Sequence, residues 1–168
     1  RRLQPVSCDL WLPRGPDLGC EVLSVRGREA LSQPFQFTVE IWCDDPDAPL
    51  ESALGADFEL LLERNGLERA LFGIIGELEI HVAAQQRSER EGVGARLELI
   101  PAFRLLEHEV DTRFFAGQSV VEILTTLLGT RLGAYERSLD TSALASTYAA
   151  RDYCVQFRES TFDFCNRI

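Results

Sequence analysis

The strongest constraint on the fold comes from residues 34–43, PFQFTVEIWC, in which apolar and polar side chains alternate. Phe35, Phe37, Val39 and Ile41 fall on one side of an extended chain, because successive side chains of a β-strand point to opposite faces. Aromatic and β-branched residues also favour strands over helices. The segment is therefore predicted to be a strand with one buried face, and it requires a sheet that covers that face.

A tight hairpin is the next signal. Asn65 and Gly66 separate two apolar-rich runs within residues 57–82. This pair favours a type I′ turn, because both residues tolerate positive φ. Gly73 and Gly76 in the returning strand predict a bulge or a bend of the kind found at a barrel corner.

Three other segments complete the first half of the chain. They are a strand at 21–27 that ends at a glycine turn, an exposed hairpin tip at 83–94, and a strand at 95–106 interrupted at Pro101. Strand signals at this spacing predict an antiparallel, barrel-like β domain over about residues 20–106.

One segment, residues 119–133, has strong helical character. Ser119 and Glu122 have the S-x-x-E spacing of a capping box. Gly133 is expected to end the helix in the left-handed conformation. The apolar positions at helical spacing, expected to pack against the domain, are Val120, Ile123, Leu124, Leu127 and Leu128.

The last part of the chain combines loop, strand and helix. Residues 134–146 are expected to be loop with a short helical turn. In 151–158, Tyr153, Val155 and Phe157 alternate with polar or smaller residues, which predicts a strand with one buried face. The following STFDFCNRI is typical of the first turns of a helix. The fold class is therefore mainly β (α+β), with one packed helix and the start of a second unit.

Composition excludes several partners. The 17 basic and 27 acidic residues give a net charge of −10, which argues against a nucleic-acid or anionic-membrane partner. No apolar run approaches the roughly 20 residues of a membrane-spanning helix. The five cysteines form no CxxC pair, so free thiols are favoured, although a Cys8–Cys20 bridge across the Pro- and Gly-rich start remains open.

The sequence contains few catalytic arrangements. Glu107, His108, Glu109 and Asp111 cluster within LEHEVDTR, but on a strand such side chains alternate sides, so a charged turn is favoured over a metal site. Neither a GxSxG elbow nor an HExxH pair occurs, and GVGARL lacks the third glycine of a phosphate-binding loop. No catalytic, cofactor-binding or metal-ligating residue is therefore assigned, and no enzyme activity is predicted.

The order of segments carries a resemblance. LSVRGREALSQPFQFTVEI, LESALG, LFGIIGELEI and RLELIPAFRLL are followed by DTRFFAGQSVVEIL and RDYCVQFRESTFDFCNRI. Together, the elements that match LSxPFxF, RxFxGxS and REYxVQYRES closely resemble the amino-terminal, phage tail hub-like region of VgrG, the spike protein of type VI secretion systems. The match begins near residue 20.

The resemblance implies a structural role. It implies a first barrel-like hub domain over 21–106, a helix-containing connection over 107–150 and the start of a second barrel over 151–168, after a poorly matched segment 1–20. The functional protein is expected to continue beyond Ile168, to form a homotrimer, and to contact a hexameric tail-tube protein, baseplate components and effectors. It is expected in the bacterial cytoplasm before firing and outside the cell or in a target envelope afterwards.

Two other readings stay open. One is the contractile-tail hub of an integrated phage, and the other is a ligand-binding β-barrel with the loop at 83–94 as its mouth.

Aromatic and charged residues mark a candidate interface, because such residue types are enriched where proteins meet. An intradomain core position is an equal alternative for the two phenylalanines of DTRFFAG. The candidate interface residues are Arg113, Phe114, Phe115, Tyr153, Gln156 and Phe157.

Overall fold

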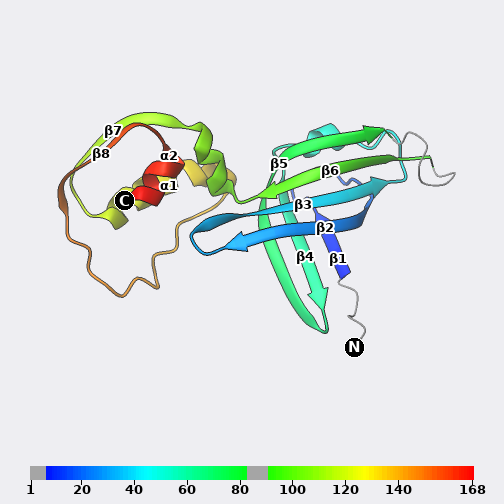
Figure 1. The fold of residues 1–168 in the computed structure, drawn as a ribbon, viewed down its shortest axis with the longest axis horizontal. Helices are drawn as coiled ribbons and strands as arrows, with labels where there is room; N and C mark the ends of the chain where they lie inside the picture. The colour runs from blue at the N-terminus through cyan, green and yellow to red at the C-terminus, as the bar shows by residue number, and fades with distance from the viewer. Residues whose placement is uncertain (1–6, 83–90) are drawn as a thin grey trace. The chain divides into compact units, whose positions relative to one another are not determined.

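The computed structural model describes residues 7–82 and 91–168, and the chain divides between Pro101 and Ala102 into two compact units. Unit 1 ends at Pro101 and unit 2 begins at Ala102. Figure 1 shows the elements of both, and each unit is described separately.

Unit 1 is a six-stranded antiparallel sheet with the order β1-β4-β5-β6-β3-β2. Its elements are β1 (Ser7–Trp11), β2 (Cys20–Ala30), β3 (Gln33–Cys43), the 3-10 helix η1 (Leu50–Ala53), β4 (Asp57–Arg64), β5 (Leu67–Val82) and β6 (Val93–Ile100). The two edge strands, β1 and β2, both contribute side chains to one apolar core, so the sheet curls around that core.

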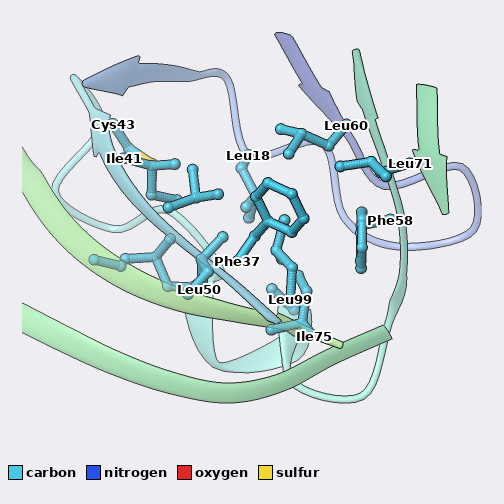
Figure 2. Packing of buried hydrophobic residues seen from close by; sticks show 14 of the residues in the cluster. Leu18, Phe37, Ile41, Cys43, Leu50, Phe58, Leu60, Leu71, Ile75 and Leu99 are labelled. Carbon is cyan, nitrogen blue, oxygen red and sulfur yellow. The ribbon is translucent and has the colours of Figure 1, made fainter. Parts of the chain in front are cut away.

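The core is built on the strand that the alternation predicts. In β3, Phe37, Val39, Ile41 and Cys43 are buried, with at most 7% of each side chain exposed. Figure 2 shows Phe37 and Ile41 among leucines from other strands and loops. The prediction for residues 34–43 is confirmed.

The tight hairpin between β4 and β5 is also confirmed. Arg64 and Leu67 are partners in the ladder, so Asn65 and Gly66 form a two-residue turn. Their φ angles of 56° and 74° lie in the left-handed region, as a type I′ turn requires.

Strand β5 forms the predicted bend. Its first half pairs with β4 and its second half with β6, and the register with β6 shifts between Ile75 and Glu77, around Gly76. Figure 1 shows β5 curving between its two partners. At Gly73 the backbone of Ile100 comes so close that a Cβ atom would lie 2.2 Å from the Ile100 carbonyl oxygen. The glycines therefore permit both the bulge and the close approach.

The end of β2 differs from the prediction. β2 does not end at Gly27 but continues to Ala30, because the ladder with β3 runs on through this residue. Gly27 is opposite Phe37, whose ring occupies the space that a side chain on Gly27 would need, so the glycine permits close packing and not a turn. The turn follows at Leu31 and Ser32.

The amino-terminal segment and the end of β6 also differ. Residues 7–11, within the segment expected to be poorly matched, form β1, which pairs with β4. The strand expected over 95–106 stops before Pro101, and residues 102–108 form the 3-10 helix η2 (Ala102–His108), because proline lacks the N–H that a continued ladder needs. Most of the predicted tip at 83–94 lies outside the described residues, and Val93 and Gly94 already belong to β6.

Unit 2 contains η2, β7 (Val110–Gln118), α1 (Val120–Leu132), the 3-10 helix η3 (Gly133–Tyr135), β8 (Arg151–Ser160) and α2 (Thr161–Arg167). The predicted capping box is present: the Ser119 hydroxyl accepts from the Glu122 amide, and the Glu122 carboxylate accepts from the Ser119 amide. The predicted helix at the chain end is confirmed as α2, whose N-cap is Ser160.

The apolar stripe of α1 is shifted from the prediction. Ile123, Leu127 and Leu128 are buried, but Val120 and Leu124 are only half-buried, and Leu132 belongs to the buried face. Gly133 does not end the helix in the left-handed conformation. Its φ is −58°, and the chain continues into η3, after which Glu136 takes the left-handed conformation at φ 52°.

All five cysteines are free, so the bridge between Cys8 and Cys20 is not formed. Cys8 lies opposite Leu62 in the ladder and Cys20 lies opposite Cys43. Within residues 7–82 and 91–168, no helix is long and apolar enough to cross a bilayer.

Candidate protein interface on the β7–β8 sheet

The candidate interface lies on the two-stranded antiparallel sheet of unit 2, in which Phe114 pairs with Val155 and Phe115 with Cys154. One side of this sheet packs against the helices. Phe115 and Cys154 contact a cluster that contains Ile123 of α1 and Phe164 of α2. The Phe115 and Phe164 rings stack with their centroids 5.6 Å apart. This side is therefore the core of unit 2.

The other side carries large apolar side chains that are exposed in this structure, because neighbouring residues of a strand point to opposite faces. We call it the β7–β8 outer face and define it by Val110, Phe114, Tyr153 and Phe157, which are 66%, 76%, 74% and 63% exposed. By contrast, the two most exposed leucines among the described residues of unit 1, Leu31 and Leu67, each lie singly at a hairpin end. Several exposed apolar residues on one face are typical of a surface that another protein covers.

Arg158 adds a positive charge beside this face. The backbone of Arg158 has φ 48°, in the left-handed region, where the register between β7 and β8 shifts. Its amide donates to the Thr112 hydroxyl at 3.2 Å, which holds the shifted chain in place. The guanidinium lies 5.5 Å from the centre of the Phe157 ring. An aromatic ring with an adjacent arginine is a combination that interfaces favour.

The structure divides the six predicted interface residues into two groups. Phe114, Tyr153 and Phe157 lie on the outer face, whereas Arg113, Phe115 and Gln156 point to the opposite side.

The inward group has structural partners within unit 2. Arg113 forms an ion pair with Asp111 at 2.6 Å. Gln156 is fully buried, and its side-chain amide donates to the Glu159 carbonyl oxygen at 3.0 Å and to the Thr161 hydroxyl at 3.4 Å. The contacts of Gln156 join β8 to the start of α2. The inward residues therefore support the outer face and do not form it.

Helix α2 is also tied to β8 by charge. Arg167 donates to the carboxylate of Glu159 at 3.0 Å and to the carbonyl oxygen of Val155 at 3.0 Å. The Arg167 guanidinium lowers the pKa of Glu159, and Glu159 in turn raises the pKa of Arg167. The strand that carries Tyr153 and Phe157 is therefore held from behind by a hydrogen-bonded ion pair.

The acidic cluster of LEHEVDTR does not converge on one point. Glu107 lies 3.6 Å from Arg104 and Glu109 lies 3.0 Å from Arg131, so their partners are different arginines. The pKa of Asp111 is lowered by a hydrogen bond from the Thr112 amide and by Arg113. Within the described parts of the chain, no group of three or more His, Cys, Asp or Glu side chains is placed to hold a metal ion.

Two cavities are large enough to be candidate ligand sites. One, of about 490 Å³, is lined by residues 10–13 and 15–20 in unit 1, and the other, of about 410 Å³, lies between α1 and residues 141–150 in unit 2. The carboxylates that line them are engaged locally: Asp17 accepts from the Gly19 amide, and Glu122 belongs to the α1 cap. Neither cavity gathers the convergent free polar groups that define a ligand pocket.

Two residues of the site, Val110 and Arg158, were not predicted. Strand alternation would place Arg158 with Gln156, on the inner side, and only the bulge moves it. No local signal in RDYCVQFRES announces that bulge. Val110 could have been found, because it continues the alternation of Thr112 and Phe114 by two residues.

Comparison with known proteins places the chain in a family. The sequence pattern of the phage tail baseplate hub (GPD) family matches residues 28–168. Two type VI secretion system spike proteins of Pseudomonas aeruginosa, VgrG1b and VgrG1a, are each 33% identical to the chain, over 90% and 99% of its length. The actin cross-linking toxin VgrG1 of Vibrio cholerae is 30% identical over 88% of the chain.

The chain spans 20% and 24% of the two Pseudomonas relatives and 14% of the Vibrio toxin. Among solved structures, it is similar to an Escherichia coli component of the type VI secretion system described as resembling the T4 bacteriophage tail proteins gp27 and gp5. That comparison has a TM-score of 0.73 at 22% identity and covers 96% of this chain and 42% of the other, so it shows a shared fold. The chain therefore belongs to the phage tail baseplate hub family, and its two units have the hub fold.

Proposed function

We propose that this chain is the hub part of the cell-puncturing tip of a type VI secretion system, where it links the tail tube to the spike. The observation that carries the proposal is the hub pattern over residues 28–168, in a chain whose curated relatives are named as spike proteins of that system. A curled antiparallel sheet around one core suits such a part, because it resists deformation from several directions.

The role that we propose is structural. The acidic cluster near His108 is engaged with arginines, and neither cavity brings several free polar groups together, so we assign no catalytic step to these residues. The Vibrio relative is named as a toxin, but the chain spans 14% of that protein. We therefore do not transfer its activity.

We propose that the full-length protein is a homotrimer and that the β7–β8 outer face contacts a neighbouring chain within it. Phe114, Tyr153 and Phe157 would serve as apolar anchors, with Arg158 at their edge. The barrel-like first unit and a second barrel would together form a ring that stacks on the hexameric tail tube, with baseplate components and effectors as further partners. Before firing the assembly would lie in the bacterial cytoplasm, and afterwards outside the cell or in a target envelope.

The isolated chain is expected to be largely monomeric. Each copy carries a net charge of −10, so three copies repel one another unless further contacts hold them together. Light scattering at low protein concentration and near-physiological salt tests this. A tight trimer would mean that residues 1–168 contain the main assembly contacts.

A delivery assay tests the function. In the bacterium that carries the gene, the gene is deleted and then restored as wild type, as a Phe114→Ser/Phe157→Ser variant, or as a Leu31→Ser control, and release of the tube protein into the medium is measured. Leu31 is 96% exposed at a hairpin turn of unit 1, so its replacement removes an apolar surface residue that does not belong to the outer face. We expect the deletion and the face variant to lose release and the control to retain it.

The outcomes separate two claims. Normal release from the deletion strain would contradict the secretion function. Loss in the deletion strain with normal release from the face variant would retain the function but show that the outer face is not an assembly contact.

The family pattern also fits a second role, the tail hub of an integrated phage, because its description is that of a phage baseplate protein. Neighbouring genes distinguish the two roles. Sheath, tube and immunity genes would indicate a secretion system, whereas capsid and portal genes would indicate a phage.

A further inference from the structure

Two cysteines of unit 1 face each other across neighbouring strands. Cys20 is the first residue of β2 and Cys43 is the last residue of β3, and they are partners in the antiparallel ladder. Partners in such a ladder have Cα atoms about 4.5 to 5.5 Å apart, which falls within the roughly 4.4 to 6.8 Å that a disulfide spans. Both thiols are free. The backbone thus places a bridgeable pair where the sequence suggested a different one.

The two thiols differ in accessibility. Cys43 is fully buried in the core, whereas Cys20 is half-buried at the start of the edge strand. Burial raises the pKa of both groups, that of Cys43 to about 11. A hydrogen bond between the two side chains opposes this rise at Cys20 and adds to it at Cys43. Cys20 is therefore the thiol that ionises more readily and that a reagent can reach.

We propose that Cys20 and Cys43 form an oxidation site, in which a small-molecule disulfide of the glutathione class converts the two thiols into an intramolecular disulfide. Cys20 is the attacking residue and Cys43 the resolving residue. The bond ties the start of edge strand β2 covalently to β3. This site is independent of the proposed function.

The disulfide forms in two successive thiol–disulfide exchanges. The Cys20 thiolate attacks one sulfur of oxidised glutathione, a mixed disulfide forms, and one glutathione thiolate leaves and takes up a proton. The Cys43 thiol then gives up its proton and attacks the Cys20 sulfur, and the second glutathione leaves as a thiol. Two protein thiols are oxidised, and one glutathione disulfide is reduced to two thiols.

The other cysteines lack this arrangement. Cys8 lies opposite Leu62, so its ladder partner is not a thiol. Cys154 and Cys165 belong to unit 2 and pack in its core. Within the described residues, Cys20 and Cys43 are the two cysteines that the register makes direct partners.

The sequence makes the test unambiguous. It contains no lysine, so trypsin cuts only after arginine, and each cysteine falls in its own peptide: 3–14, 15–26, 29–64, 152–158 and 159–167. The folded chain is incubated with oxidised glutathione, remaining thiols are blocked with iodoacetamide, and the digest is analysed by mass spectrometry without reduction. We expect peptide 15–26 linked to 29–64, two hydrogens lighter than their sum, and loss of the link on reduction.

Variants test the order of events. Cys43→Ser should stop the reaction at a stable mixed disulfide on Cys20, and Cys20→Ser should leave Cys43 largely unmodified because it is buried. Cys8→Ser should form the same link at the wild-type rate. A link between peptides 3–14 and 15–26 would overturn the proposal. It would also be overturned if all five cysteines were modified to the same extent in the folded chain as they are in urea.

Discussion

Replacing Gly73 by alanine should destabilise unit 1 strongly. A Cβ atom at this position would lie 2.2 Å from the carbonyl oxygen of Ile100 and 2.7 Å from a ring carbon of Phe58. Carbon atoms in contact normally lie about 3.5 to 4.0 Å apart, so both neighbours must move, and no rotamer change can move the Ile100 carbonyl because it is backbone. Phe58 is 1% exposed in the core and Ile100 closes β6, so neither has free space.

The size of the effect follows from overpacking, which costs about 1–3 kcal/mol in a close-packed core. Because one of the two clashes involves backbone, we expect the upper part of that range. The smaller conformational entropy of alanine in the unfolded chain offsets about 0.4–1 kcal/mol. The net loss is therefore about 2 kcal/mol, or roughly a 30-fold change in the folding equilibrium.

Gly129→Ala is the matched control. Gly129 lies inside α1, its φ is not positive, and a Cβ atom there meets nothing within 4 Å. The same chemical change should therefore stabilise unit 2 by about 0.5–1 kcal/mol, through helix propensity.

The assay is urea unfolding followed by two signals. Both tryptophans, Trp11 and Trp42, lie in unit 1, so their fluorescence reports on that unit. Helices α1 and α2 lie in unit 2, so far-ultraviolet circular dichroism near the helical minimum reports mainly on unit 2. If Gly73→Ala leaves the tryptophan midpoint unchanged, or if both variants shift in the same direction, the close approach of β5 and β6 is wrong.

Three further predictions use the same two signals. Ile123→Ala, at a fully buried position of α1, should cost unit 2 about 2–5 kcal/mol, and Leu124→Ala should cost less because Leu124 is half-buried; equal losses would contradict the shifted stripe. Asn65→Ala should lower the tryptophan midpoint and reduce the free energy of unfolding of unit 1 by about 1 kcal/mol, because alanine tolerates the left-handed conformation poorly. Asn65→Gly should have little effect. The pKa of Glu122 is lowered by hydrogen bonds from the Ser119 amide and hydroxyl, so its stabilising effect is present above about pH 4.5 and is lost as the pH falls below that value. Glu122→Gln should therefore destabilise unit 2 at pH 7 and by progressively less as the pH falls below about 4.5, and a difference that does not depend on pH would argue against the carboxylate.

The elements that were predicted correctly are those specified by local signals. The alternation of Phe37, Val39 and Ile41 determines which face of β3 is buried, and Asn65 with Gly66 determines the turn, because few residues accept two positive φ angles in succession. The capping box of α1 is also local, since Ser119 and Glu122 satisfy each other's backbone amides. Each of these features depends on residues that lie only a few positions apart in the sequence.

The face of β8 shows where local reasoning ends. Its strand was predicted correctly, but its aromatic residues suggest that Tyr153, Val155 and Phe157 form the buried side, whereas the core takes Cys154 and Gln156. Burial of a glutamine requires partners, and these come from Glu159 and Thr161 after the strand. The packing of α1 and α2 decides which side is covered, and the period of the strand alone does not contain that information.

The same limit applies to the interface residues. Alternation correctly separates Phe114 from Phe115, but it does not say which of them faces the helices. The stacking of Phe115 on Phe164 settles that question, and the partner lies almost 50 residues further along the chain.

Strand β5 is hydrogen-bonded to β4 along its first half and to β6 along its second half, so it connects the two parts of the sheet. A force applied at the Asn65–Gly66 hairpin is therefore transmitted along the covalent backbone of β5, past the glycine bend and into the part of the sheet that contains β6. Pulling the two parts of the sheet apart would require either unzipping one complete ladder or straightening the bulge at Gly76. We therefore expect unit 1 to respond to a load as one continuous curved sheet, in which strands far from the loaded end share the force.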